Sequence, residues 1–171
     1  MPSVLAAVHH PPTLDDLATS DATQRMTRMK VAIQQGHGTL STYASFMGAT
    51  NPFYVFVAPE YYFVKSSTGG NNEVWTLHTP DEKKRIFEEL RALSSRYKRF
   101  LLAPGTVSWC QPRRVAQGAR THDGWNTAPI FYEGKLKHEY DKIMDDGVFT
   151  RTTANVLFQR GQKSQLFTVS H

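Results

Sequence analysis

The chain has 171 residues, a length that suits one domain with a sizeable core. Hydrophobic residues make up 40% and charged residues 20%, and no apolar run is long enough to span a membrane. The net charge is +5, but the basic residues are scattered, which argues against a nucleic-acid partner. The single cysteine, Cys110, excludes an intrachain disulfide and a zinc site of several cysteines.

The amino-terminal stretch MPSVLAAVHHPP lacks the basic start of a secretory signal, so we expect a cytoplasmic protein that contacts no membrane. The seven histidines show no spacing typical of metal ligands, and we expect neither a metal nor another cofactor. No internal repeat or low-complexity linker divides the chain, which predicts a single domain over residues 1–171.

The amino-terminal part of the chain predicts one strand and a helical region. Residues 3–8 are expected to form the strand. Ser20 is the expected cap of a helix that begins near Asp21 and carries an apolar stripe at helical spacing. The glycines in segment 36–38 are expected to interrupt this helix, and residues 40–47 to form a further helical stretch.

The middle of the chain predicts a strand, a helix and a second strand. Residues 53–58 are an almost unbroken apolar run, typical of a strand covered on both faces. The segment Thr79-Pro80-Asp81-Glu82 predicts a helix start, with a capping threonine, a proline and a glutamate at the favoured positions. Residues 100–103 are a second apolar run, so the three elements predict a right-handed parallel crossover.

The carboxyl-terminal part predicts a loop, a hairpin and a late strand. Residues 111–124 are polar and basic and are expected to form a loop. Segments 128–132 and 135–140 flank the dipeptide Glu133-Gly134, which is typical of a hairpin turn. Residues 145–162 look irregular, and residues 165–169 are expected to form a last strand.

This alternation predicts an α/β protein, in which binding sites gather just past the carboxyl ends of strands. Glu60 follows the first apolar strand, and Lys142 follows the second strand of the hairpin. Trp109 and Cys110 are expected just past the strand that begins at Phe100. These four residues are therefore the first candidates for a site.

Glu60 stands alone as a charge in VFVAPEYYF, residues 55–63. A structural ion pair or a strand-end cap would explain it. Alternatively, Pro59 presets the backbone, and the aromatic rings at 61–63 would lower the local dielectric and raise the proton affinity of Glu60, as a general base needs. For Lys142 the plain alternative is a surface lysine whose stem lies along the tyrosine-rich strand end.

Three segments, taken in order, resemble the nitrilase, or carbon–nitrogen hydrolase, superfamily. VFVAPEYYF resembles the family's apolar strand ending in Pro-Glu. WNTAPIFYEGKLKHEYDKIM, residues 125–144, resembles its Asn-Thr hairpin with a glycine turn and a Tyr-x-Lys segment. Between them, the helix from Pro80 and the strand FLLAPGTVSW match the expected crossover. The hairpin positions in register are Asn126, Gly134, Tyr140 and Lys142.

The resemblance implies an incomplete α-β-β-α sandwich with a mixed, partly parallel sheet, in which a β-hairpin carries the lysine. It also implies an amidase- or nitrilase-like hydrolase of a small non-peptide amide or nitrile. A cysteine thiolate would attack the substrate carbon, Glu60 would be the general base, and Lys142 would stabilise the charged intermediate. The residues expected to line the pocket are Tyr61, Trp109, Cys110, Asn126 and Asp145.

The family's catalytic cysteine follows its lysine, whereas no cysteine follows Lys142 here. We therefore expect a truncated domain that is inactive alone and depends on a missing carboxyl-terminal segment or on assembly into a homo-oligomer. Cys110 precedes Lys142 and stands beside Trp109, so an inert thiol that lines the pocket is expected rather than the nucleophile. The alternative function is a non-catalytic module that pairs with another chain.

Overall fold

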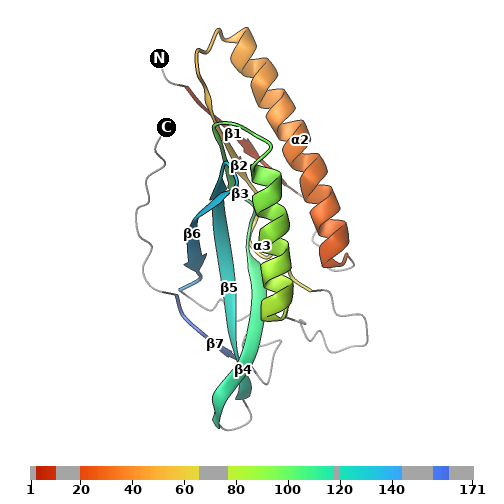
Figure 1. The fold of residues 1–171 in the computed structure, drawn as a ribbon, viewed down its shortest axis with the longest axis vertical. Helices are drawn as coiled ribbons and strands as arrows, with labels where there is room; N and C mark the ends of the chain where they lie inside the picture. Colours follow the sequence, from red (N-terminus) through yellow and green to blue (C-terminus); the bar gives the residue numbers. More distant parts are fainter. Residues whose placement is uncertain (1–2, 11–19, 66–76, 118–119, 144–155, 162–171) are drawn as a thin grey trace.

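The computed structural model describes residues 3–10, 20–65, 77–117, 120–143 and 156–161. These ranges form one mixed sheet with two helices on one of its faces (Figure 1). The sheet order is β1-β2-β3-β5-β4, and β6 and β7 also pair with β5. The expected α/β class and partly parallel sheet are confirmed. The strands are β1 (Val4–Val8), β2 (Phe53–Val57), β3 (Phe100–Ala103), β4 (Val107–Gln117), β5 (Arg120–Tyr132), β6 (Lys135–Asp141) and β7 (Val156–Phe158), and the helices are α2 (Ala22–Phe46) and α3 (Pro80–Ser94).

Strand directions bring the ends of β2 and β6 to the same edge of the sheet. Strands β1, β2 and β3 are mutually parallel, as the crossover predicted through α3 requires. Strand β5 is antiparallel to β3, and β6 is antiparallel to β5, so β6 runs in the same direction as β2. The residues that follow β2 and β6 therefore emerge at the same edge.

The hydrophobic core lies between the sheet and the two helices. Phe56, Phe100 and Leu102 point from the strands toward Met29 and Leu90 of the helices, and all five are at most 1% exposed. Burying side chains of this size stabilises the fold by about 1.5–3 kcal/mol each. Of the described helices, none is both long enough and apolar enough to cross a membrane.

The other face of the sheet is partly uncovered. Val57, next to buried Phe56 on β2, is 37% exposed, and Val4 and Val8 on β1 are 67% and 74% exposed. The expectation that the strand over 53–58 is covered on both faces is wrong. Both helices lie on one face of the sheet (Figure 1). The side chains of β2 that point to this face are therefore buried, and those that point to the other face are more accessible.

Helix α2 is continuous, contrary to the expected interruption at the glycines in segment 36–38. Gly36 is needed for close packing, because a Cβ there would lie 3.3 Å from both Ala7 and Phe56 of the sheet. The helix cap is also one residue later than expected. Asp21 accepts from the backbone N–H of Gln24, so it is the cap in place of Ser20.

The predicted start of α3 and the predicted hairpin are confirmed. Thr79 caps α3 in a reciprocal pair with Glu82. At the turn between β5 and β6, Glu133 and Gly134 have φ values of 47° and 75°, the left-handed pair that a two-residue hairpin turn requires. Both motifs act within four residues, which is why the sequence pattern suffices to identify them.

The loop expected over 111–124 is instead the paired ends of β4 and β5. Figure 1 shows the two strands continuing past the amino-terminal first turn of α3, beyond the helix-covered core. Backbone hydrogen bonds between β4 and β5, rather than burial of side chains, stabilise this part of the sheet. The sequence of these strand ends therefore lacks the alternation of apolar and polar residues by which a strand is predicted. Strand β7 lies within the segment expected to be irregular, while residues 165–169 lie outside the described residues.

Gly105 supports the turn that follows β2. It has a φ of 85°, and a Cβ there would lie 2.2 Å from the carbonyl oxygen of Pro59 and 2.9 Å from the Cβ of Tyr62. The chain segments around Pro59 and Gly105 can approach this closely only because position 105 carries no side chain. The position of Glu60, one residue after Pro59, depends on this contact.

We predict that Gly105→Ala lowers the free energy of unfolding by about 1–3 kcal/mol more than Gly48→Ala, because only the first creates a steric clash. Gly48 is a matched control, since its φ is 61° and a Cβ there meets nothing within 4 Å. Urea denaturation of both variants measures the difference. Equal losses would show that the close approach at Pro59 does not constrain the fold.

Candidate functional site

Glu60 and Tyr61 form a turn directly after β2. Tyr61 has a φ of 59°, in the left-handed region that is costly for a bulky side chain. Its backbone N–H donates to Oγ1 of Thr106 over 2.7 Å, which helps to hold the turn. The side chains of both Glu60 and Tyr61 contact Lys142 as a result.

Lys142 follows β6 and forms an ion pair with Glu60. Its Nζ lies 2.8 Å from Oε1 of Glu60 and donates to the hydroxyl oxygen of Tyr61 over 3.1 Å. The same ammonium lies 5.0 Å from the centre of the Tyr61 ring, within cation–π range. Two residues 82 positions apart in the sequence are therefore in direct contact.

Asn126 of β5 holds both members of this pair. Its side-chain Nδ2 donates to Oε1 of Glu60 over 3.0 Å, and its backbone oxygen accepts from the backbone N–H of Lys142 over 2.9 Å. The Asn126 side chain is fully buried, and its Oδ1 accepts from Oγ of Ser108 over 3.1 Å. Because Ser108 occupies the oxygen, the amide nitrogen faces Glu60.

A cavity of about 370 Å³ lies beside the ion pair, on the sheet face opposite the helices. Glu60, Lys142 and Asn126 line its polar part. The remaining wall is largely apolar, so a small molecule in this space would meet one carboxylate, one ammonium and one amide. The apolar wall includes Val57, Ala103, Ala128, Ile130 and Tyr140.

The ion pair is too accessible to be a major source of stability. The side chain of Glu60 is 44% exposed and that of Lys142 is 19% exposed. Pairs of this kind contribute about 0–1 kcal/mol. The expected dry, aromatic surroundings of Glu60 are not found, because Tyr62 and Phe63 turn into the core and only Tyr61 lies against the pair.

Trp109 and Cys110 lie within β4, not past the end of a strand as expected. Trp109 stacks on Trp125 at 4.5 Å between ring centres and donates from Nε1 to Oγ1 of Thr127 over 2.8 Å. The ammonium of Lys83 on α3 lies 4.4 Å from the Trp109 ring centre. Trp109 thus faces α3, and it does not line the cavity beside Glu60.

Cys110 is also separate from the ion pair. Burial raises the pKa of its thiol, and of the nearby charges Lys65 lowers it while Glu82 raises it. Neither of these charges belongs to the Glu60–Lys142 pair. A thiol with a raised pKa is a poor nucleophile at neutral pH. Cys110, which was expected to line the pocket, is not among the residues that line the cavity beside Glu60.

Of the predicted residues, the structure brings together Glu60, Tyr61, Asn126 and Lys142, whereas Asp145 lies outside the described residues. Sequence reasoning missed Thr106 and Ser108, the hydroxyl groups that hold Tyr61 and Asn126. Ser108 is directly opposite Asn126 in the β4–β5 register, and no local sequence signal could have identified that pairing. A search of protein-family models and a search of curated proteins find no match for this chain.

We predict that Asn126→Asp destabilises the protein by about 1–3 kcal/mol at pH 7, because a buried carboxylate would replace a donor to Glu60. Burial and the charge of Glu60 would raise the folded-state pKa of the new carboxyl group. The loss is therefore fully present above that pKa and shrinks as the pH falls through it. Urea denaturation at pH 7 and pH 5 measures both effects.

The double variant Asn126→Asp/Glu60→Gln separates electrostatic repulsion from simple loss of packing. It removes the like charge and supplies an amide donor in its place, so it should recover part of the stability at pH 7. No recovery, together with a loss that does not depend on pH, would contradict the described contact between positions 60 and 126.

Proposed function

We propose that Glu60 and Lys142 are the base and the charge-stabilising group of a carbon–nitrogen hydrolase centre of the nitrilase type. The observation that carries this proposal is the 2.8 Å contact between the two side chains beside a largely apolar cavity of about 370 Å³. The ordered sequence resemblance and the hydrogen bond from Asn126 to Glu60 support it. The substrate would be a small non-peptide amide or nitrile.

In the proposed reaction of an amide, Glu60 takes the proton of a thiol, and the thiolate attacks the substrate carbonyl carbon. Lys142 stabilises the negative charge that develops on the carbonyl oxygen. The Glu60 carboxyl group returns the proton to the leaving nitrogen, so ammonia and a thioester form. Water then hydrolyses the thioester to a carboxylic acid and restores the thiol.

Cys110 is not the thiol that we propose, because it does not line the cavity beside Glu60 and burial raises the pKa of its thiol. It is the only cysteine among the 171 residues. We therefore propose that a thiol from a further segment or from a second chain completes the centre. Part of the cavity wall would come from the same source, since Glu60 is 44% exposed.

A small added thiol such as 2-mercaptoethanol tests this proposal. We predict that the chain releases ammonia from short aliphatic amides or nitriles only when the thiol is present. Glu60→Gln and Lys142→Met should each lower this thiol-dependent rate about 10²-fold, because they remove the base and the compensating charge. A coupled ammonia assay measures the rate.

Two variants serve as controls for this assay. Lys135→Met removes an exposed lysine from the start of β6 without touching the cavity, and Cys110→Ala removes the native thiol. Both should keep the thiol-dependent rate. The proposal fails if no thiol-dependent rate is found, or if that rate survives both Glu60→Gln and Lys142→Met.

A second candidate function is a non-catalytic module that pairs with another chain through the accessible face of the sheet. Val4 and Val8 on β1, together with Val57 on β2, form an exposed apolar row on this face. Neighbouring apolar side chains of this kind are typical of surfaces that become buried on association. In this case the Glu60–Lys142 pair would be a structural contact at the rim of the interface.

For the pairing module we predict a dimer at micromolar concentration that Val8→Lys dissociates, since a charge would be buried at the interface. Val31→Lys is the matched control, because Val31 is also exposed but lies on α2. Sedimentation equilibrium of the three proteins measures the association. A monomeric parent chain, or equal dissociation by both variants, would exclude pairing through this face.

A further inference from the structure

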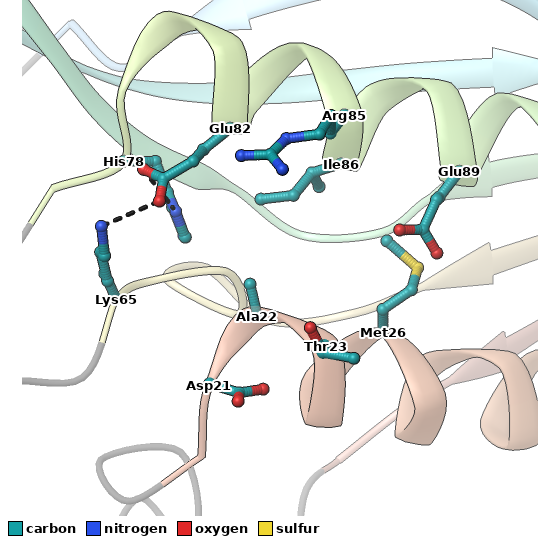
Figure 2. A pocket seen from close by; sticks show the side chains of 10 residues that line it. All are labelled: Asp21, Ala22, Thr23, Met26, Lys65, His78, Glu82, Arg85, Ile86 and Glu89. Atoms are coloured by element: carbon teal, nitrogen blue, oxygen red, sulfur yellow. Dashed lines mark hydrogen bonds and ion pairs between the residues drawn. The ribbon is translucent and has the colours of Figure 1, made fainter.

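A second cavity lies on the helix-covered side of the sheet and shares no residue with the cavity beside Glu60. Its volume is about 290 Å³, and it opens between the first turns of α2 and α3. Figure 2 shows that both helices begin at the same end of this cavity. The positive ends of two helix dipoles therefore converge on one small space.

His78 provides an independent indication that the cavity takes a ligand. It is 1% exposed, it lines the cavity, and neither ring nitrogen makes a hydrogen bond within the described residues. The nearest charged atom is Oε2 of Glu82, which lies 3.7 Å from Nδ1 and is too far for a hydrogen bond. Buried polar atoms are nearly always hydrogen-bonded, so an unpaired imidazole at a cavity wall indicates a missing partner.

The guanidinium of Arg85 is the second group of the cavity that could bind a ligand. It makes no hydrogen bond or ion pair with any residue in the described ranges. In Figure 2 its guanidinium extends from α3 along the cavity toward the end that holds Glu82 and His78. A guanidinium presents a planar fork of donors that matches a carboxylate or a phosphate.

The three carboxylates that line the cavity are already engaged. Asp21 caps α2, and Glu89 forms an ion pair with Lys30 at 2.9 Å. Glu82 accepts from Lys65 over 2.9 Å and from the backbone N–H of Thr79 over 2.7 Å. Burial is the largest single influence on its pKa and raises it, but the contacts with Lys65 and Thr79 and the charges of Lys65 and His78 together lower the pKa to about 2. Among the described residues that line the cavity, the ionisable groups still without a hydrogen bond are therefore the side chains of Arg85 and His78. Both can donate hydrogen bonds, so the cavity is better suited to an anion than to a cation.

Burial and the charges of Arg25 on α2, Glu82 on α3 and Lys65 act on the pKa of His78. Burial is the largest influence and lowers its pKa, and Lys65 and Arg25 lower it further. The Glu82 carboxylate and a contact with the backbone of Phe63, which lies outside hydrogen-bond geometry, act in the opposite direction. The net result is a pKa of the His78 ring below its usual value. An anion beside it would favour the protonated form.

We propose that this cavity binds the oxyanion group of a small organic molecule, a carboxylate or a phosphate, through Arg85 and His78. Met26 and Ile86 provide an apolar wall for the body of the ligand. The volume of about 290 Å³ limits the ligand to a small molecule. This inference does not rest on the proposed hydrolase activity, since the two cavities have no residue in common.

Imidazole nitrogen NMR of the full chain, titrated with sodium butyrate and separately with sodium phosphate, tests the proposal. Sodium chloride keeps the ionic strength constant, and the loss of one signal in His78→Gln assigns the ring. We expect a saturable shift of the His78 nitrogens toward the protonated state. A response to butyrate alone identifies a carboxylate site, one to phosphate alone a phosphate site, and one to both a general oxyanion site.

Arg85→Gln supplies the deciding comparison, because Arg85 is exposed and its replacement leaves the core intact even if His78→Gln fails to fold. It should weaken binding at least about tenfold, through loss of a bidentate charged contact. Arg91→Gln makes the same change of charge on α3 outside this cavity and should leave the affinity unchanged. No saturable shift with either probe, or equal affinity in Arg85→Gln, would overturn the proposal.

Discussion

The pairing register of β5 is the constraint on which the rest of the structure depends. This strand pairs with β3, β4, β6 and β7, so it joins the parallel part of the sheet to the antiparallel part. Asn126, near its middle, bonds Glu60 through its side chain and the backbone of Lys142 through its carbonyl oxygen. A slip of one residue in β5 would turn the Asn126 amide to the other face and separate the pair.

The energetics of the two contacts differ in kind. The Glu60–Lys142 ion pair is partly accessible and adds little to stability, whereas the buried Asn126–Ser108 hydrogen bond would be costly to leave unmade. The fold thus uses a fully buried polar network to position a pair that contributes little to folding. A buried network that only positions a weakly stabilising pair is easier to explain if the pair acts on a ligand in the adjoining cavity. We therefore favour a catalytic role for the pair over a structural one.

The two faces of the sheet carry two separate polar sites. On the accessible face, Glu60 and Lys142 are paired beside a largely apolar cavity. On the helix-covered face, His78 and Arg85 lie near the starts of two helices, and neither side chain makes a hydrogen bond to another part of the chain that the structure describes. Cys110 belongs electrostatically to the second group, because Lys65 and Glu82 influence its pKa. The second site is built from α2, α3 and the segments that carry Lys65 and His78, so it uses no side chain of a described strand.

The sequence by itself determined the features that depend on a few neighbouring residues. The capping box of α3 and the hairpin turn at Glu133-Gly134 are local hydrogen-bond and dihedral patterns, and the structure confirms both. The polar segment 111–124 was misjudged because strand pairing there replaces burial. Only the tertiary structure decided that Asn126 holds Glu60 against Lys142, and that the His78 ring makes no hydrogen bond within the described ranges, since both follow from contacts between distant strands and helices. Such contacts depend on register and packing, which residue spacing does not encode.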